Sequence, residues 1–337
     1  MEDTMSGLSQ LWRAGVAAIG IVAFACALSA QPAASGTLAK GTHLITLGTR
    51  SGPLPTAVRA QSSNLLIING ALYLIDAGDG VTRRLARGGY AIRDIDHVFI
   101  THLHDDHSAG LIPLMSVQYD MGRNKTVDIH GPPGTETLVR AALQYLAVNS
   151  DIRISDGTTH LVIGKIFAGH DLGTGTVYRD ENVTVKGVEN SHFHFPPASP
   201  AYGKTKSYSY RFETPEKTIV FTGDTGPSEA LTELAKGADM LVTEISSFDD
   251  AKELALKNGR WERMSREEQA SFDHHMKEEH LSADEVGKMA SRAAVKTVVL
   301  THIPATSDPK DEYKRYADAV KTFFSGQVLI AKDLMQF

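Results

Sequence analysis

The chain has 337 residues, of which 42% are hydrophobic and 22% charged, and its formal net charge is −6. This composition excludes a largely disordered chain, and the length allows one large core or two smaller ones. An acidic chain without a block of lysine and arginine offers no basic face to a nucleic acid, so we expect a small-molecule substrate and no nucleic-acid partner.

Residues 1–30 have the pattern of a secretory signal peptide. Arg13 precedes an uncharged, mostly apolar stretch over 14–30, which ends in small residues at Ala30. We therefore expect a periplasmic or secreted protein that has no stable membrane association after signal removal. Two alternatives are an uncleaved anchor helix, since about 17 apolar residues just span a bilayer, and a lipid attached to Cys26.

Cys26 is the only cysteine and lies inside this segment. Cleavage would leave a mature chain without a thiol, which excludes disulfides and thiolate zinc sites. Any metal must then be held by histidine and carboxylate side chains.

The rest of the chain alternates strand and helix patterns. Residues 31–42 are rich in proline, alanine, glycine and serine and indicate a flexible lead-in, followed by a single domain over 43–337. Strands are predicted over 43–49, 64–69, 71–75, 98–101, 127–130, 183–188, 208–212, 218–221, 240–244 and 297–301. Helices are predicted over 80–87, 108–119, 135–147, 228–236, 283–294 and 311–324, with an exposed helical excursion around 262–279. Hairpins and helix crossovers occur in both halves, which predicts a four-layer α/β/β/α sandwich.

Three of the apolar strands end next to a residue that binds metal well. The runs 98–101, 219–223 and 298–301 lead into His102, Asp224 and His302 respectively. Strands that stop side by side bring such residues together, so a metal site is expected at their ends.

The segment 102–107 holds three histidines and two aspartates. In an extended segment His102 and His104 project from the same face, so both can bind one ion. Asp106 and His107 follow where the strand turns into a helix, so they can serve a second ion. Asp105 is expected to be a solvated or helix-capping carboxylate. The alternative for the whole segment is a histidine-rich solvated loop.

This segment resembles the His-x-His-x-Asp-His motif of the metallo-β-lactamase superfamily. The resemblance extends from Asp76 to Pro304 and implies that Asp76 is a structural carboxylate below the metal loop. It also implies that two metal ions are held by His102, His104, Asp106, His107, His192, Asp224 and His302, with Asp224 bridging. His194 is the alternative to His192, which is favoured because it directly follows a predicted strand.

Glu244 and His280 are similar to a glutamate and a histidine of the ribonuclease Z branch of that superfamily. The resemblance implies that the glutamate orients the histidine, which donates a proton to the leaving group. Ile245 and Ser246 depart from the branch's usual Ala-Thr. Arylsulfatases of this branch share both residues, so RNA is not singled out. The alternatives are a helix-start or surface carboxylate and a helix-capping histidine.

The net charge of the expected metal centre indicates the kind of substrate that it would bind. Five neutral imidazoles and two aspartates oppose two divalent ions, and with a bridging hydroxide the centre keeps about one positive charge. We expect a dinuclear zinc-dependent hydrolase, with Mn²⁺ or Fe²⁺ as substitutes, in which metal-bound hydroxide attacks an anionic phosphodiester or sulfate ester. Asp106, Glu244 and His280 are the expected catalytic residues. The alternatives are a lactonase or β-lactamase-type hydrolase and a non-catalytic zinc-binding protein, and a homodimer is left open.

Two further expectations concern the surroundings. The segment 191–206 has no strand or helix pattern. It is expected to line the pocket with Phe193, Phe195, Tyr202 and either Lys204 or Lys206. The alternative is a solvated loop. Five histidines match no ligand position and are assigned no role: His130, His160, His170, His274 and His275.

Overall fold

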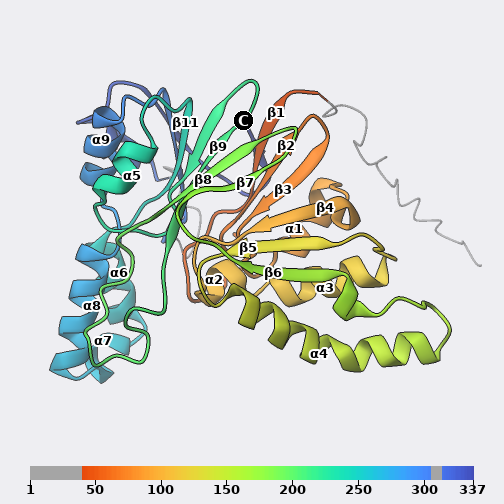
Figure 1. The fold of residues 1–337 in the computed structure, drawn as a ribbon. Helices are drawn as coiled ribbons and strands as arrows, with labels where there is room; N and C mark the ends of the chain where they lie inside the picture. Colours follow the sequence, from red (N-terminus) through yellow and green to blue (C-terminus); the bar gives the residue numbers. More distant parts are fainter. Residues whose placement is uncertain (1–39, 305–312) are drawn as a thin grey trace, which may run out of the picture. The chain divides into compact units, whose positions relative to one another are not determined.

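Two seven-stranded sheets face each other in the computed structural model, which describes residues 40–304 and 313–337 (Figure 1). In spatial order, the first sheet contains β14 (Met335–Gln336), β1 (Thr42–Gly48), β2 (Ser63–Ile68), β3 (Ala71–Ile75), β4 (Ile95–Phe99), β5 (Val127–Gly131) and β6 (Phe167–Asp171). The second contains β13 (Gln327–Ile330), β12 (Thr297–Thr301), β11 (Met240–Glu244), β10 (Thr218–Phe221), β9 (Tyr208–Glu213), β8 (Thr184–Glu189) and β7 (Gly175–Arg179).

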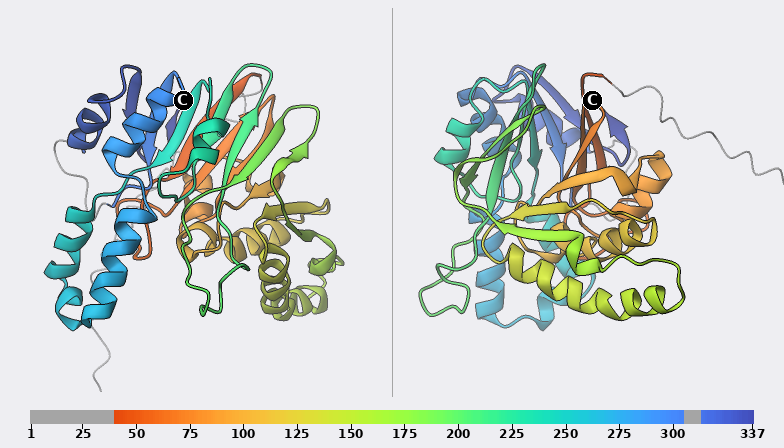
Figure 2. Two further views of the ribbon diagram at one scale, coloured as in Figure 1. Left: turned by 60° about the vertical axis from the view of Figure 1, so that its left-hand side comes forward. Right: turned by 45° about the vertical axis from the view of Figure 1, so that its right-hand side comes forward.

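Helices cover the outer face of each sheet. The first sheet is covered by α1 (Val81–Gly88), α3 (Leu111–Asp120) and α4 (Thr135–Ser155), while α2 (Asp105–Ser108) is a single turn after β4. The second sheet is covered by α5 (Glu229–Leu234), α9 (Ala283–Arg292) and α10 (Lys314–Lys321). A helical projection, formed by α6 (Phe248–Lys257), α7 (Arg260–Arg263) and α8 (Arg266–Glu278), extends beyond the second sheet (Figure 2). The predicted four-layer sandwich is confirmed.

Three apolar clusters hold these layers together. One lies under α1, α3 and α4, one lies under α5, α9 and α10, and the third lies between the sheets. In the third, Phe99 of β4 meets Phe212 of β9 edge to face, with ring centroids 5.2 Å apart. Truncating one such buried ring to alanine typically costs about 3–5 kcal/mol, so this contact fixes the sheets against each other.

The direction of the strands determines where the candidate site lies. In the first sheet β3 to β6 run parallel, and in the second β10 to β13 do. The carboxyl ends of parallel strands share one edge of a sheet, which is where α/β proteins bind ligands. The loops that follow β4, β10 and β12 therefore meet at one edge of the sandwich.

The helix predicted over 108–119 is wrong in its start, because α2 ends at Ser108 and α3 begins at Leu111. Gly110 lies between them and donates its N–H to the carbonyl oxygen of Ala77 at 2.8 Å. A Cβ at Gly110 would lie 2.3 Å from the carbonyl oxygen of Gly78. The chain is thus drawn against the loop after β3, and the apolar periodicity did not reveal this break.

Other predicted elements differ in extent. Helix α4 continues to Ser155 rather than ending at 147, and strands β6, β7, β13 and β14 were not predicted. These strands are short and have partly exposed residues, so they lack a strong alternating pattern.

The predicted signal peptide and residues 31–39 of the lead-in lie outside the described residues. Thr42, predicted to be in the lead-in, begins β1. Among the helices that the structure describes, none has the length and apolar character needed to cross a membrane.

Candidate metal centre

All seven predicted ligands lie at the shared edge of the sandwich. His102 follows β4, His192 follows β8, Asp224 follows β10 and His302 comes directly after β12. The turn α2 brings Asp106 and His107 to the same place. The tertiary structure therefore gathers side chains that are up to 200 positions apart in the sequence.

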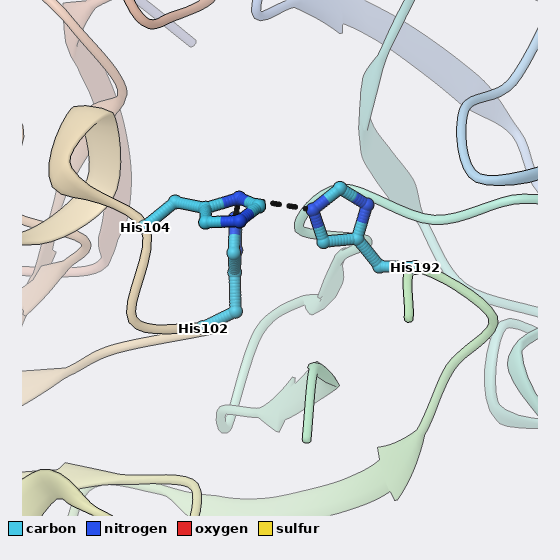
Figure 3. A group of neighbouring side chains, drawn as sticks. All are labelled: His102, His104 and His192. Atoms are coloured by element: carbon cyan, nitrogen blue, oxygen red, sulfur yellow. Dashed lines mark hydrogen bonds between the residues drawn. The ribbon is translucent and has the colours of Figure 1, made fainter. Parts of the chain in front are cut away.

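Three histidines form the first group (Figure 3). His102 Nε2 lies 3.1 Å and His192 Nε2 lies 3.2 Å from His104 Nδ1. Burial lowers the pKa of His102 well below its usual value and the pKa of His192 to about 3. Burial also lowers the pKa of His104. Neutral rings with converging nitrogen atoms are what a divalent cation requires.

The orientation of His192 is fixed by a backbone carbonyl. Its Nδ1 donates to the carbonyl oxygen of Glu279 at 3.0 Å. That hydrogen bond places the ring proton on Nδ1 and leaves the Nε2 lone pair free, as is common for metal-ligating histidines. His194 lies apart from this group and is exposed, so the structure separates the two alternatives in favour of His192.

The second group contains two aspartates and two histidines, all buried. His302 Nε2 lies 3.1 Å from Asp106 Oδ2 and 3.2 Å from Asp224 Oδ2. His107 Nε2 lies 3.3 Å from Asp224 Oδ1. Burial alone would lower the pKa of His107, but the carboxylates of Asp224, Asp76 and Asp106 outweigh it and hold that pKa well above its usual value.

Asp224 belongs to both parts of the centre. Besides contacting His107 and His302, it forms a possible ligand group with His192 and His280, whose ligand atoms all lie within 4.8 Å of one another. A carboxylate in this position can bridge two ions, as the sequence predicted.

Two aspartates near the centre have other contacts. Asp76 Oδ2 accepts a hydrogen bond from His107 Nδ1 at 2.8 Å, and its Oδ1 accepts the N–H of Thr101 at 2.8 Å. It therefore orients a ligand from below, which agrees with the structural role predicted for it. Asp105 is exposed and accepts the N–H of Asp106 in the first turn of α2.

The residues present fit metal ions. His107 Nε2 and Asp224 Oδ1 are buried and have no hydrogen-bond partner, although buried polar atoms are nearly always satisfied. The two groups supply only nitrogen and oxygen donors, the set preferred by zinc, manganese and iron in thiol-free sites. A cation between the facing atoms would satisfy both.

Glu244 and His280 form a buried pair beside this centre. His280 Nδ1 donates to Glu244 Oε2 at 2.7 Å, and Glu244 Oε1 accepts the N–H of Thr225 at 2.6 Å. Burial and then the charge of Asp224 raise the pKa of Glu244, while burial lowers the pKa of His280 to about 4. The pair therefore matches neither alternative. Both side chains are buried rather than on the surface, and the side chain that caps α9 is that of Ser282, not that of His280.

His275 was assigned no role, but it lies beside this pair. Its Nε2 is 3.2 Å from His280 Nε2, and its Nδ1 donates to Glu279 Oε2 at 2.6 Å. The spacing of His275 and Glu279, four residues apart on one helix face, is the sequence signal that could have found the contact.

A cavity of about 390 Å³ opens over the metal centre. Its apolar wall includes Leu254 of α6 and Phe272 and Met276 of α8, and Arg50 and Arg260 supply positive charge. The helical excursion predicted around 262–279 is therefore helical, but its inner side lines the pocket.

The prediction that segment 191–206 walls the pocket with aromatic and lysine side chains is wrong. Of this segment only His192 lines the cavity. Tyr202 is exposed, and Lys206 pairs with Glu189 at 2.7 Å. Phe193 packs against the rings of His104 and His192 instead.

Comparisons with known proteins agree on the family. A model of the β-lactamase superfamily domain matches residues 72–303. Ribonuclease Z of Brevibacillus brevis is 30% identical over 293 residues, which cover 79% of this chain and 86% of that protein. Two crystal structures share the fold: the metallo-β-lactamase fold protein YhfI from Bacillus subtilis (TM-score 0.62, 21% identity) and the short form of human tRNase Z (TM-score 0.60, 20% identity). Each match covers 88% of this chain and 98% of the solved one.

Proposed function

Since the chain belongs to the metallo-β-lactamase superfamily, in its ribonuclease Z branch, and is thus a metal-dependent hydrolase, we propose that it cleaves a small anionic ester, a phosphodiester in preference to a sulfate ester. The observation that carries the proposal is the position of the buried Glu244–His280 pair, which lines the same cavity as five of the seven predicted ligands, namely His104, Asp106, His192, Asp224 and His302. A lactonase or β-lactamase-type hydrolase would not need this pair.

The metal ions would be held in two places. His102, His104 and His192 would hold one ion, and Asp106, His107 and His302 the other, with Asp224 between them. Zinc is the first choice for this donor set, with manganese or iron as substitutes. When bound, such ions polarise the ester oxygen and lower the pKa of water, which supplies the nucleophile.

His280 would protonate the leaving group. Its hydrogen bond to Glu244 fixes the ring through Nδ1, so Nε2, which lies 3.2 Å from His275 Nε2, is the nitrogen that would exchange this contact for one to the substrate. Burial keeps the free ring neutral, because its pKa is lowered to about 4. An anionic ester beside the ring would raise that pKa, so the ring would gain its proton as the substrate binds and release it to the departing oxygen.

The cavity supports a small substrate with an apolar group. Its volume of about 390 Å³ suits a small organic molecule. Leu254, Phe272 and Met276 would contact an aromatic or aliphatic part of the ester, while Arg50 and Arg260 would attract its charge.

RNA is the second candidate substrate. The relatives that match most of the chain are called ribonuclease Z, so the expectation that nucleic acid is not a partner is in doubt. The acidic net charge of −6 speaks against strong binding to a polyanion.

One panel of substrates tests these alternatives. Purified protein would be assayed on an aryl phosphodiester, an aryl sulfate, a lactone, a cephalosporin and a precursor tRNA, each with and without a chelator. We expect the phosphodiester to be cleaved fastest and the chelator to abolish turnover. Dominant lactone turnover that His280→Ala leaves unchanged would contradict the proposal. Bound zinc without turnover on any substrate would favour the non-catalytic alternative.

We also propose that residues 1–30 direct export to the periplasm. The support is the sequence pattern alone, a basic residue followed by an apolar stretch and a small-residue exit. Fusing these residues to a reporter that is active only after export would test it. Reporter activity equal to that of a leaderless fusion would contradict the proposal.

A further inference from the structure

A third group of ligand-type side chains lies outside the centre described above. His194, His274 and Glu279 place one ligand atom each within 4.8 Å of the others. His194 lies in the segment after β8, His274 lies on α8 and Glu279 comes directly after α8. None of the three belongs to the two groups proposed to hold the catalytic ions.

We propose that these three side chains bind a further divalent cation of the zinc class. Two imidazoles and one carboxylate form a common zinc ligand set, with water in the remaining position. The site would fasten the segment that carries His192 to the end of the helix that leads to His280.

The distances suit a cation better than direct hydrogen bonds. His194 Nδ1 and His274 Nε2 each lie 3.8 Å from Glu279 Oε1, which is too long for a hydrogen bond. Ligand atoms on a tetrahedral zinc ion with bonds of about 2.0–2.1 Å lie about 3.3 Å apart. For these two pairs of atoms the difference is about 0.5 Å.

The two histidines are free to make that adjustment. Their side chains are 45% and 54% exposed, so little desolvation opposes binding. The ring centroids lie 6.1 Å apart in an edge-to-face arrangement. A cation at this place would have three protein ligands and one position open to water.

Glu279, in contrast, is held in place. Its side chain is 13% exposed, its Oε2 accepts a hydrogen bond from His275 Nδ1 at 2.6 Å, and its Oε1 accepts the N–H of His194 at 3.3 Å. A carboxylate oriented by a neighbouring histidine is typical support for a metal ligand.

The position links the site to the catalytic residues. The carbonyl oxygen of Glu279 accepts the hydrogen bond from His192 Nδ1, and the next residue is His280. A cation bound to the Glu279 side chain would therefore restrict the backbone that orients both histidines.

Counting bound zinc tests the proposal independently of hydrolysis. The full, untagged chain would be stripped of metal, titrated with zinc by calorimetry and measured by elemental analysis after dialysis. We expect the wild-type protein to bind one zinc ion more than His274→Ala or His194→Ala, or those variants to bind that ion at least tenfold more weakly.

His160→Ala is the matched control, since His160 is also an exposed histidine but belongs to no ligand group found in the described residues. It should bind as many zinc ions as the wild-type protein. Equal stoichiometry and equal affinity in wild type, His274→Ala and His194→Ala would overturn the proposal. Loss of zinc from all variants alike, including His160→Ala, would also overturn it, because that loss would reflect non-specific binding.

Discussion

The contact between Gly52 and Asp106 gives the sharpest prediction. A Cβ at Gly52 would lie 2.2 Å from Asp106 Cγ and 2.3 Å from its Oδ2, the oxygen that faces His302. Ordinary contact begins at 3.4 Å, so Gly52→Ala must move the carboxylate and the Gly52 backbone apart by about 1.2 Å. Gly52 does not have a positive φ, so the effect is steric and not a matter of backbone preference.

The size of the effect follows from that displacement. A misplacement of about 1 Å in a catalytic arrangement lowers the rate by about 10²-fold, which corresponds to about 2.7 kcal/mol. We expect Gly52→Ala to lower kcat/KM on an aryl phosphodiester by about this factor and to bind one metal ion fewer, or much more weakly, than the wild-type protein.

The assay needs a control glycine at which an added Cβ would contact no other atom. Gly173 also lacks a positive φ, and a Cβ there would have no atom within 4 Å, so Gly173→Ala should match the wild-type protein in rate and metal content. Circular dichroism would show that both variants fold. If folded Gly52→Ala kept its full metal content and a rate within about threefold of wild type, the steric reasoning would be refuted.

Four other changes should have separable effects. Glu244→Gln leaves one amide oxygen in place of the two carboxyl oxygens that accept from His280 Nδ1 and from the N–H of Thr225, so His280 loses its orientation and kcat should fall by about 10²–10⁴-fold with little change in bound metal; loss of metal instead would contradict this role. Asp76→Asn weakens support for His107 and should lower metal affinity by about 10–100-fold, measured by competition with a chromophoric chelator, and unchanged affinity would count against it. Phe272→Ala removes part of the apolar wall, so KM for an aryl ester should rise while metal content stays constant; an equal rise for a methyl ester would speak against aryl contact. Chelation should lower the melting temperature, because ions at about 1,000 times their Kd contribute about 4 kcal/mol; an unchanged melting curve would show that the centre does not bind the ions in the folded state.

The sequence determined much of the centre because its signals are local. His102, His104, Asp106 and His107 occupy one short segment, and strand ends could be recognised from the apolar runs before Asp224 and His302. Strands β3, β11 and β12 have the predicted bounds, since buried parallel strands are nearly continuous apolar runs.

The tertiary structure alone decided how those residues meet. It separated His192 from His194, because only the former has its Nδ1 hydrogen-bonded to the Glu279 carbonyl. It also placed the inner side of α8 along the wall of the pocket. At Gly110 it interrupted the predicted helix, because the backbone of the loop after β3 lies against that glycine. Such contacts join residues far apart in the chain, and a local pattern of apolar and polar residues carries no information about which distant backbone will lie against it.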